Sequence, residues 1–590
     1  MQLGVLSGFK FKDFFSSNPL VVLLFLSFLL IAGAKTVLSL SFVSPFVLGD
    51  ESLYANMARS IASDWYTGLT YGFYPPGYSL LLSPIYLLTS DQATAYSAIL
   101  VINSVVTSLI LFPSFFILKR FIRPNIALLG SILIALSPSV TTYSFVIFSE
   151  NLFTLLFMLS AWALIKMREH NNKFFAALAG FLLFALFLTR ATGIAVIAAF
   201  LFVVVYDFIK EKMSVRAIAT SYYVSAIFFF APLVIWFFYT ISIGAAGLPK
   251  APVYVPGSYS PSAYLSSLLQ VFSDSHSFLT FLGLFSNQLA FLIVSSFFLF
   301  FATAVISFLL IQHVKRKDSF IVLVIYSAFS SLFLVVISAT HMYRGLTVVL
   351  SPGYLVYGRY IAPAVPLLLV IGLIGFFYLR FRKNNFLHIS LLFLFLLLIS
   401  FPLGSISRYR FPSNMPIHYL LSYNTASTGI QEFLQPVFML FFYAIASLVF
   451  IFAYLRSKQK DKIIAISIIF FCLVSVAAFI PAYSQARSNS FKTHDANVIG
   501  RYLQSNANES TVLIMPLLPG NPVVNGRIRY MADFWVQVKV IGVDYDITAD
   551  SNFTSLPDAD YLLSRHLLPY DVVAEDPDGT RLYLLNSRAS

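Results

Sequence analysis

Two adjacent carboxylates, Asp50 and Glu51, are the first residues that could do chemistry, within the stretch GDESLYANMARSIASDW (49–65). Only 11% of the 590 residues are charged, and this acidic pair follows directly after a long apolar segment. A carboxylate can act as a general base that takes a proton from a hydroxyl group. Asp50 could also be the N-cap of a helix over 51–62, with Glu51 favoured in its first turn by the helix dipole. The two roles are compatible, because a capped and rigid carboxylate is a good base.

Further ionisable residues fall at the predicted outer ends of apolar segments: Arg59, Glu150, Arg190, His341, Arg344, Arg359, Arg408 and Arg410. In a chain this apolar, ionisable groups at membrane depth are functional candidates. Arginine holds phosphate through paired hydrogen bonds. Structural alternatives stay open: Glu150 could cap a helix or form an ion pair with Arg190, Arg359 could be an interfacial anchor, and His341 could be an ordinary interfacial histidine.

An aromatic and proline-rich stretch, YGFYPPGYSLLLSPIYLL, follows the acidic pair. Pro75 and Pro76 most often end a helix and fix a turn. Tyr74 and Tyr78, which flank them, are better suited to touch a sugar or a lipid.

The elements that position these residues are membrane spans. The chain is 58% hydrophobic with a mean hydropathy of +0.82, whereas soluble domains are about 45–50% apolar. We therefore predict a polytopic α-helical membrane protein of about thirteen spans, placed at 20–43, 93–118, 126–146, 150–166, 174–189, 191–206, 219–242, 289–312, 319–340, 361–379, 386–403, 433–455 and 463–481.

The charge distribution orients these spans. With the N-terminus inside, the inner segments hold 21 of the 38 Lys and Arg but only 6 of the 25 Asp and Glu. The formal net charge of +13 therefore reflects the positive-inside rule rather than nucleic-acid binding. Residues 174–206 are predicted as a hairpin with Arg190 at its outer turn, because a single span would bury this charge at the bilayer centre.

Two domains follow from this topology. Residues 1–483 form the transmembrane domain, with a first outer loop at 44–92. Residues 484–590 form a small extracytoplasmic α/β domain, with a helix in DANVIGRYLQSN, strands in STVLIMP, WVQVKVIGV and DADYLLS, and a hairpin in YDVVAEDPDGTRLYLLN. In the outer segment 243–288, the apolar face of AYLSSLLQVF predicts a helix that lies in the membrane interface.

The expected class of donor follows from the absence of nucleotide-binding motifs in the predicted inner segments. The sequence contains no P-loop and no GxGxxG motif, and the inner loops are too short to form a nucleotide-binding domain. An activated substrate that reaches the outer face is therefore expected within the membrane, as a lipid-linked phosphosugar. Asp50 and Glu51 alone are too few for a closed metal site, and there is no His/Cys cluster with zinc spacing. We expect no cofactor, with a divalent metal as the alternative.

The first outer loop resembles that of the C-type (GT-C) membrane glycosyltransferases, in the branch that contains the protein O-mannosyltransferases and the lipid A aminoarabinose transferase. The resemblance continues in LSPSVTTYSFVIFSENLFTLLF, LTRATG and YGRYIAPAVPLL and covers about the first 380 residues. It implies the GT-C fold and an inverting transfer of a sugar from a polyprenyl- or dolichyl-phosphate carrier to an acceptor hydroxyl. Asp50 would be the base and Glu51 its support.

The outer span ends and the segments that carry the resemblance together give the candidate substrate-binding residues: Tyr54, Arg59, Tyr74, Pro75, Pro76, Tyr78, Glu150, Arg190, His341, Arg344, Arg359 and Tyr360. One departure concerns the residue before the proline pair. The aminoarabinose transferase pattern has a Lys there, near the donor phosphate, and this chain has Tyr74. The phosphate contact is therefore expected from other residues.

The expected partners are the lipid-phosphate sugar donor, a glycan, lipid or protein acceptor, and membrane lipid, without nucleic acid. We expect a prokaryotic plasma membrane, because relatives with a single soluble tail are typical there. Two alternatives remain. A ligase for lipid-linked glycans would share the arginine-rich outer face but would not need the acidic loop. A flippase or transporter would need charges deeper in the membrane, and usually repeat symmetry.

Overall fold

The computed structural model describes residues 19–46, 48–65, 69, 74–170, 172–210, 215–245, 261–309, 318–349, 356–378, 386–401, 420, 430–495, 497–506, 511–514, 535, 539–542, 560–564, 570–577 and 579–585.

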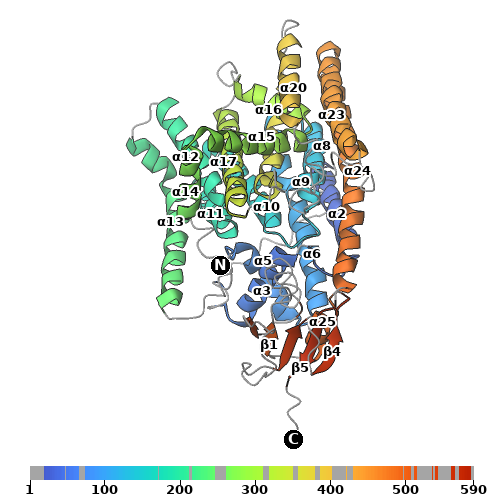
Figure 1. Cartoon of the computed structure of the whole chain (residues 1–590). Coiled ribbons are helices and arrows are strands. Elements are labelled where there is room, and N and C mark those ends of the chain that lie inside the picture. Colours follow the sequence, from blue (N-terminus) through green and yellow to red (C-terminus); the bar gives the residue numbers. More distant parts are fainter. Residues whose placement is uncertain are drawn as a thin grey trace, which may run out of the picture.

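The described chain is mostly helical and continues into a small sheet at its C-terminal end (Figure 1). The first half of the chain contains α2 (Pro19–Ser39), α3 (Leu48–Ser63), α5 (Gly77–Leu88), α6 (Gln92–Leu109), α7 (Leu111–Phe121), α8 (Pro124–Leu136), α9 (Pro138–Thr141), α10 (Glu150–His170), α11 (Lys173–Thr189), α12 (Gly193–Lys210), α13 (Val215–Ala245) and α14 (Pro261–Val271). The second half contains α15 (Ser275–Ser295), α16 (Leu299–Leu309), α17 (Asp318–Val349), α18 (Gly358–Ile361), the 3-10 turn η2 (Ala362–Ala364), α19 (Val365–Tyr378), α20 (Phe386–Ser400), α23 (Ile430–Arg456), α24 (Lys460–Asp495) and α25 (Val498–Asn506).

The prediction of a polytopic membrane protein is confirmed. Within the described residues, nine helical segments are long and apolar enough to cross a bilayer, and six shorter apolar helices accompany them. The lipid-facing helices expose large apolar side chains, such as Phe237 in α13 and Leu473 in α24. The chain is an integral membrane protein.

The predicted hairpin around Arg190 is present. The helix α11 ends at Thr189, Arg190 is its C-cap, and α12 begins at Gly193. The helix predicted within 263–272 is also present as α14, where Leu265 and Leu269 are exposed, and its place in the membrane interface stays a prediction.

One predicted span is broken, and one helix is longer than its predicted span. The span at 289–312 is broken, because Phe297 and Phe298 adopt left-handed backbone angles between α15 and α16. Both side chains are fully buried, so packing holds a conformation that no local signal indicates. The helix α24, which contains the predicted span at 463–481, continues to Asp495, so the predicted domain boundary at 484 falls inside a helix.

The helices α3 and α5 lie between the helical bundle and the strands (Figure 1). They pack on each other, and Ser79 of α5 donates a hydrogen bond of 3.0 Å to the carbonyl of Tyr54 in α3. The start of α5 also meets the end of α11. A Cβ atom at Gly77 would lie 2.8 Å from the carbonyl oxygen of Leu188, so only glycine allows this approach. This contact brings the segment 74–76 next to Arg190.

The C-terminal strands form one five-stranded sheet in the order β2-β1-β3-β5-β4. Its strands are β1 (Thr511–Ile514), β2 (Lys539–Gly542), β3 (Tyr561–Ser564), β4 (Asp571–Glu575) and β5 (Arg581–Leu584). The strand β1 pairs in parallel with β2 and β3, whereas β5 is antiparallel to both β3 and β4. The predicted hairpin is confirmed, and Gly579 takes a φ of +82° in its turn.

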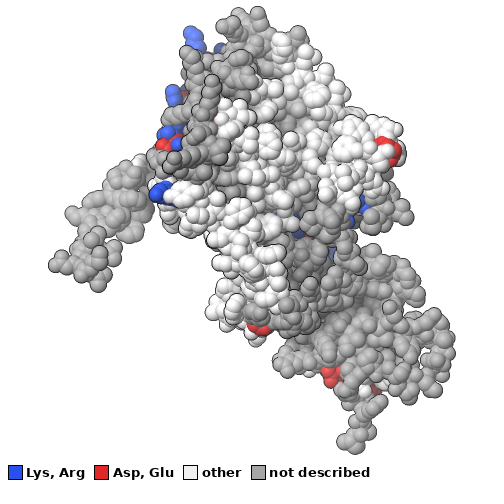
Figure 2. Space-filling view, turned by 90° about the vertical axis from the view of Figure 1, so that its left-hand side faces the viewer, with Lys and Arg blue, Asp and Glu red and all other residues white. Residues whose placement is uncertain are grey.

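Basic side chains gather along the upper edge of the face shown in Figure 2, away from the strands, and much of the middle of that face is uncharged. At the predicted inner loops, Arg120 pairs with Glu169 and Arg123 pairs with Asp461. The side of the membrane that these residues face stays a prediction.

Candidate active site

Four charged side chains form one buried ion-pair chain beside the first loop. Arg190 Nη1 lies 2.7 Å from Glu150 Oε2, and Arg359 Nε lies 2.5 Å from Glu150 Oε1. The guanidinium group of Arg359 also pairs with Asp50 through its Nη1. Three of these side chains are at most 8% exposed, while Asp50 is 22% exposed. The chain of charges therefore ends at the one carboxylate that a substrate can reach.

Each of these side chains comes from the end of a different element. Asp50 lies in the first turn of α3, and Glu150 is the first residue of α10. Arg190 caps α11, and Arg359 belongs to the short helix α18. The helix α3 begins at Leu48, so Asp50 is not the N-cap that the sequence suggested. The dipole of α3 still favours a negative charge at this position.

Tyr74 donates a hydrogen bond to Asp50 Oδ1, while Arg359 occupies Asp50 Oδ2. Burial raises the pKa of Asp50, but the charge of Arg359 and the hydrogen bond from Tyr74 outweigh this, so the pKa is lowered overall. Burial and the carboxylate of Asp50 hold the pKa of Tyr74 well above its usual value. At neutral pH the pair is thus a carboxylate acceptor and a phenol donor.

Glu51 points away from this chain of charges and into the protein. Its side chain is fully buried, and its Oε1 and Oε2 accept the backbone N–H groups of Phe46 and Ile147 at 3.1 and 3.0 Å. These bonds tie the start of α3 to the segment before α10. Glu51 is therefore placed to support Asp50 through the backbone.

Tyr54 and Tyr78 lie on the protein-interior side of Tyr74, the partner of Asp50. The hydroxyl group of Tyr54 is 2.8 Å from Ser149 Oγ, and its ring stacks on Tyr74 with centroids 4.8 Å apart. Burial raises the pKa of Tyr54 to about 12. Tyr78 is fully buried and donates to Asn103 Oδ1 at 2.8 Å, so it lies in the core.

An aromatic cluster borders the other side of the ion-pair chain. His341 of α17 lies against Tyr357 and Tyr360, with ring centroids 4.9 Å apart in both contacts. Arg190 lies over the ring of Tyr360 at 5.3 Å. Arg344, one turn beyond His341 in α17, is 9% exposed and acts electrostatically on His341. A third arginine thus lies near the two in the ion-pair chain.

Three further predicted substrate-binding residues, Arg59, Pro75 and Pro76, are not members of the ion-pair chain. Arg59 Nη2 donates to Gln92 Oε1 at 2.5 Å, and its guanidinium group lies 5.5 Å from the centre of the Tyr86 ring. Pro76 is the N-cap of α5, and Pro75 precedes it. These two prolines position Tyr74 at the start of α5. Arg408 and Arg410 lie outside the described residues.

No group of three or more His, Cys, Asp or Glu side chains within the described ranges is arranged to hold a metal ion. Both oxygens of Asp50 are occupied by Tyr74 and Arg359. Metal independence remains a prediction.

Sequence reasoning missed several contact residues. Arg359 lies 3.7 Å above the ring of Phe148, and Tyr357 completes the aromatic cluster. Gln288, fully buried in the apolar helix α15, accepts hydrogen bonds from Ser338 and from the backbone of Tyr357. Two adjacent amides, Asn287 and Gln288, in an apolar span are the signal that could have identified Gln288.

The chain resembles known proteins in sequence over part of its length. Residues 74–236 match the model of the dolichyl-phosphate-mannose-protein mannosyltransferase family, which is less than half of the chain. No curated protein sequence matches significantly. The family match begins at Tyr74 and does not include Asp50, so the case for Asp50 depends on geometry.

The structure matches ArnT from Cupriavidus metallidurans over nearly the full length of both chains. In the complex with undecaprenyl phosphate, the TM-score is 0.53 at 14% identity, with 97% of this chain and 99% of that chain covered. The GT-C fold is shown. The apo form gives a TM-score of 0.52 at 14% identity, covering 96% and 98% of the two chains. The Archaeoglobus fulgidus oligosaccharyltransferase matches at a TM-score of 0.36 and 12% identity, covering 88% of this chain and 64% of that one.

The GT-C fold confirms the resemblance that the first outer loop and the fragments around Glu150, Arg190 and Arg359 indicated. These four regions, far apart in sequence, meet in the ion-pair chain.

Proposed function

We propose that this protein is an inverting glycosyltransferase that moves a sugar from a polyprenyl-phosphate carrier to an acceptor hydroxyl, with Asp50 as the general base. The observation that supports this most is the position of Asp50. It is the exposed end of a buried Asp–Arg–Glu–Arg chain of charges on a GT-C fold. An ionised carboxylate fixed beside arginines matches a reaction that removes a proton near a phosphate.

The transfer is a single displacement. The acceptor hydroxyl replaces Tyr74 as the hydrogen-bond donor to Asp50 Oδ1. Its oxygen attacks the anomeric carbon while the bond from that carbon to the phosphate oxygen breaks, and the lipid phosphate leaves with the electron pair. The acceptor proton passes to Asp50. Because the pKa of Asp50 is low, proton transfer comes late, after much positive charge has developed on the sugar.

The charge balance suits a phosphodiester donor. Arg190, Arg344 and Arg359 carry three positive charges, and Asp50 and Glu150 carry two negative ones. A lipid-phosphate sugar has one negative charge, which would neutralise the cluster. Within the described residues, Arg190 makes hydrogen bonds only through Nη1, so its Nε and Nη2 are available to the phosphate. These contacts would replace the Lys that is absent before Pro75.

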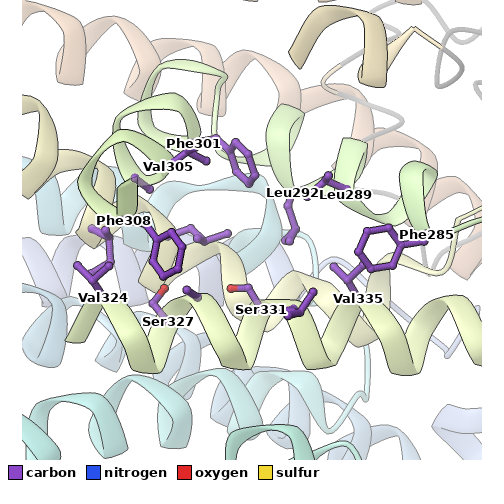
Figure 3. A pocket seen from close by; sticks show the side chains of 15 residues that line it. Phe285, Leu289, Leu292, Phe301, Val305, Phe308, Val324, Ser327, Ser331 and Val335 are labelled. Atoms are coloured by element: carbon purple, nitrogen blue, oxygen red, sulfur yellow. The ribbon is translucent and has the colours of Figure 1, made fainter. Parts of the chain in front are cut away.

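An apolar groove offers a place for the lipid tail. A cavity of about 190 Å³ lies between α15, α16, α17 and α19, with Phe285, Phe301 and Phe308 in its lining (Figure 3). Phe308 is 41% exposed, so the groove opens toward lipid. The helix α17 carries Val335 at one end of this groove and His341 six residues later, about 9 Å farther along its axis.

Finer features of the proposal come from the sequence. The charge asymmetry favours an outer location for the site and the strands, with the N-terminus inside and the protein in a prokaryotic plasma membrane. A glycan, lipid or protein could supply the acceptor hydroxyl, and the sugar could be a hexose or a pentose.

The test is a donor screen. Purified protein in liposomes receives polyprenyl-monophosphate sugars, polyprenyl-diphosphate sugars or nucleotide sugars, each labelled in the sugar, and the freed lipid product is measured. We expect turnover with at least one monophosphate donor and none with nucleotide sugars. Turnover with diphosphate donors alone would support a glycan ligase instead. Transport of label into the liposomes without cleavage would replace the proposal with a flippase.

A further inference from the structure

The helix α24 reaches well beyond the membrane-spanning part of the molecule. Its 36 residues measure about 54 Å, compared with a hydrocarbon core of about 30 Å. In Figure 1, α24 runs along the bundle to α25 and the strands. Its C-terminal third therefore lies beside the first loop, at the level of α3 and α5.

Ser490, in this part of α24, is bonded to the chain just before Asp50. The side chain of Ser490 is fully buried. Its Oγ accepts the backbone N–H groups of Val43 and Ser44 at 3.1 and 2.9 Å and donates to the Ser44 carbonyl at 2.5 Å. Ser44 Oγ donates in return to the Ser490 carbonyl at 2.8 Å. This reciprocal set joins two segments 446 residues apart.

Neighbouring contacts hold the same segment. Tyr483, two turns earlier in α24, shares a hydrogen bond of 2.7 Å with Ser41. Phe42 stacks on Phe145 with centroids 5.2 Å apart. Tyr96 donates to the Ser44 carbonyl at 3.0 Å. Residues 41–44 are thus fixed against α24 and the membrane helices.

The fixed segment leads to Asp50 within six residues. Phe46 donates its N–H to Glu51, whose other oxygen accepts the N–H of Ile147. Ser490 therefore sets the position of the chain that enters α3, and Glu51 fixes the first turn of α3 in which Asp50 lies. Buried hydrogen bonds of this kind are costly to leave unmade.

The helix α24 leads into α25 and the five strands β1–β5, which together are called the strand domain. After α24, α25 packs on β4, and Asp576 accepts the N–H of Ile499 at 3.0 Å. Gln504 of α25 donates to Asp91, the N-cap of α6, at 3.1 Å. The strand domain is therefore held to the membrane helices close to the first loop.

We propose that Ser490 is a positioning residue for Asp50, through which α24 and the strand domain fix the geometry of the catalytic loop. This inference rests on the proposed function for the role of Asp50. A shift of about 1 Å in a reacting group can lower a rate about 100-fold, so a loosened segment 41–44 should lower kcat.

The matched pair of variants is Ser490→Ala and Ser475→Ala. Ser475 is also fully buried in α24, but among the described residues its Oγ bonds only to the Phe471 carbonyl of its own helix, at 2.8 Å. We expect Ser490→Ala to lower kcat about 10- to 100-fold with the donor KM within about twofold. Ser475→Ala should leave both constants within about twofold. Ser490→Thr, which keeps the hydroxyl, should recover most of kcat.

Hydrogen exchange gives a readout that does not depend on activity. Amides of residues 43–51 should exchange faster in Ser490→Ala than in wild type, and those in Ser475→Ala should not. Equal exchange and equal kcat in the two alanine variants would overturn the inference. If Ser490→Ala does not fold, Ser44→Ala removes one bond of the set and should lower kcat by a smaller factor, whereas a wild-type kcat would overturn the inference. The two proposals can fail separately. If residues 43–51 exchange faster in Ser490→Ala but the wild-type protein turns over no lipid-phosphate sugar, the proposed function is overturned and the structural role of Ser490 is not.

Discussion

Asp50 keeps its negative charge because Arg359 and Tyr74 together outweigh the cost of its burial. Such a carboxylate is a weak base, but it is always ready to accept a proton at neutral pH. The arrangement is suited to a reaction in which the donor phosphate leaves easily and the base is needed late.

The low pKa of Asp50 predicts the pH dependence of the reaction. A carboxyl group whose pKa is lowered on folding stabilises the protein above its unfolded pKa of about 3.9, and this contribution is lost as pH falls through the folded value. We expect that protonation of Asp50 does not lower kcat/KM between about pH 5 and 8. An acid limb near pH 6 that disappears in Asp50→Asn would contradict this.

Tyr74 occupies the oxygen of Asp50 that the acceptor must use. In Tyr74→Phe, the acceptor no longer competes with the phenol, so we expect the acceptor KM to fall and kcat to change less than about tenfold. The acid limb should also move to higher pH, because Asp50 loses a hydrogen bond to its charged form. Steady-state kinetics against acceptor concentration measures both effects. A loss as large as that of Asp50→Asn would show instead that the phenol takes part in the chemistry.

At the scale of the elements, the site is assembled from helix ends. The tight start of α5 at Gly77 brings Tyr74 toward the end of α11, and α18 presents Arg359 to α3 and α10. The helix α17 joins the aromatic cluster at His341 to the apolar groove of Figure 3. In that groove the hydroxyl groups of Ser327 and Ser331 have no hydrogen-bond partner among the described residues.

Donor chain length tests the role of the groove. Ala304 of α16 lines the groove, whereas Leu309 of the same helix is 66% exposed and does not. Ala304→Trp should raise KM for a long-chain donor about tenfold, because the tail loses buried contacts, and leave KM for a short-chain analogue unchanged. Leu309→Trp is the matched control. Equal effects of Ala304→Trp on both donors would contradict the role of the groove as the tail site.

At the scale of the whole molecule, the sequence predicted the helical membrane class and the strands, since apolar runs and turn residues are local signals. The GT-C fold was expected from the family resemblance of the first outer loop. The meeting of Glu150, Arg190 and Arg359 followed from topology, because outer span ends share one face. The ion pair of Glu150 with Arg190 was one of the alternatives that the sequence offered, and it is present. The sequence could not show that Arg359 pairs with both Glu150 and Asp50, that Glu51 bonds to backbone, or that Phe297 and Phe298 break a span. Those features depend on packing between segments far apart in the chain.

The position of α24 against the first loop also depends on contacts between residues far apart in the sequence. A bond between Ser490 and Ser44 joins the end of the chain to its beginning, and no pattern around either serine indicates it. Ser467 and Ser475 of α24 donate to carbonyl groups of their own helix, and the sequence does not distinguish Ser490 from them.

The central claim is that Asp50 takes the acceptor proton, and the most direct measurement compares Asp50→Asn with Asp274→Asn. Asp274 is an exposed N-cap, that of α15, and serves as the matched control. With a labelled polyprenyl-phosphate sugar, we predict that kcat/KM falls about 100- to 10,000-fold in Asp50→Asn and stays within about threefold in Asp274→Asn. An Asp50→Asn variant that releases lipid phosphate at the wild-type rate would contradict the account.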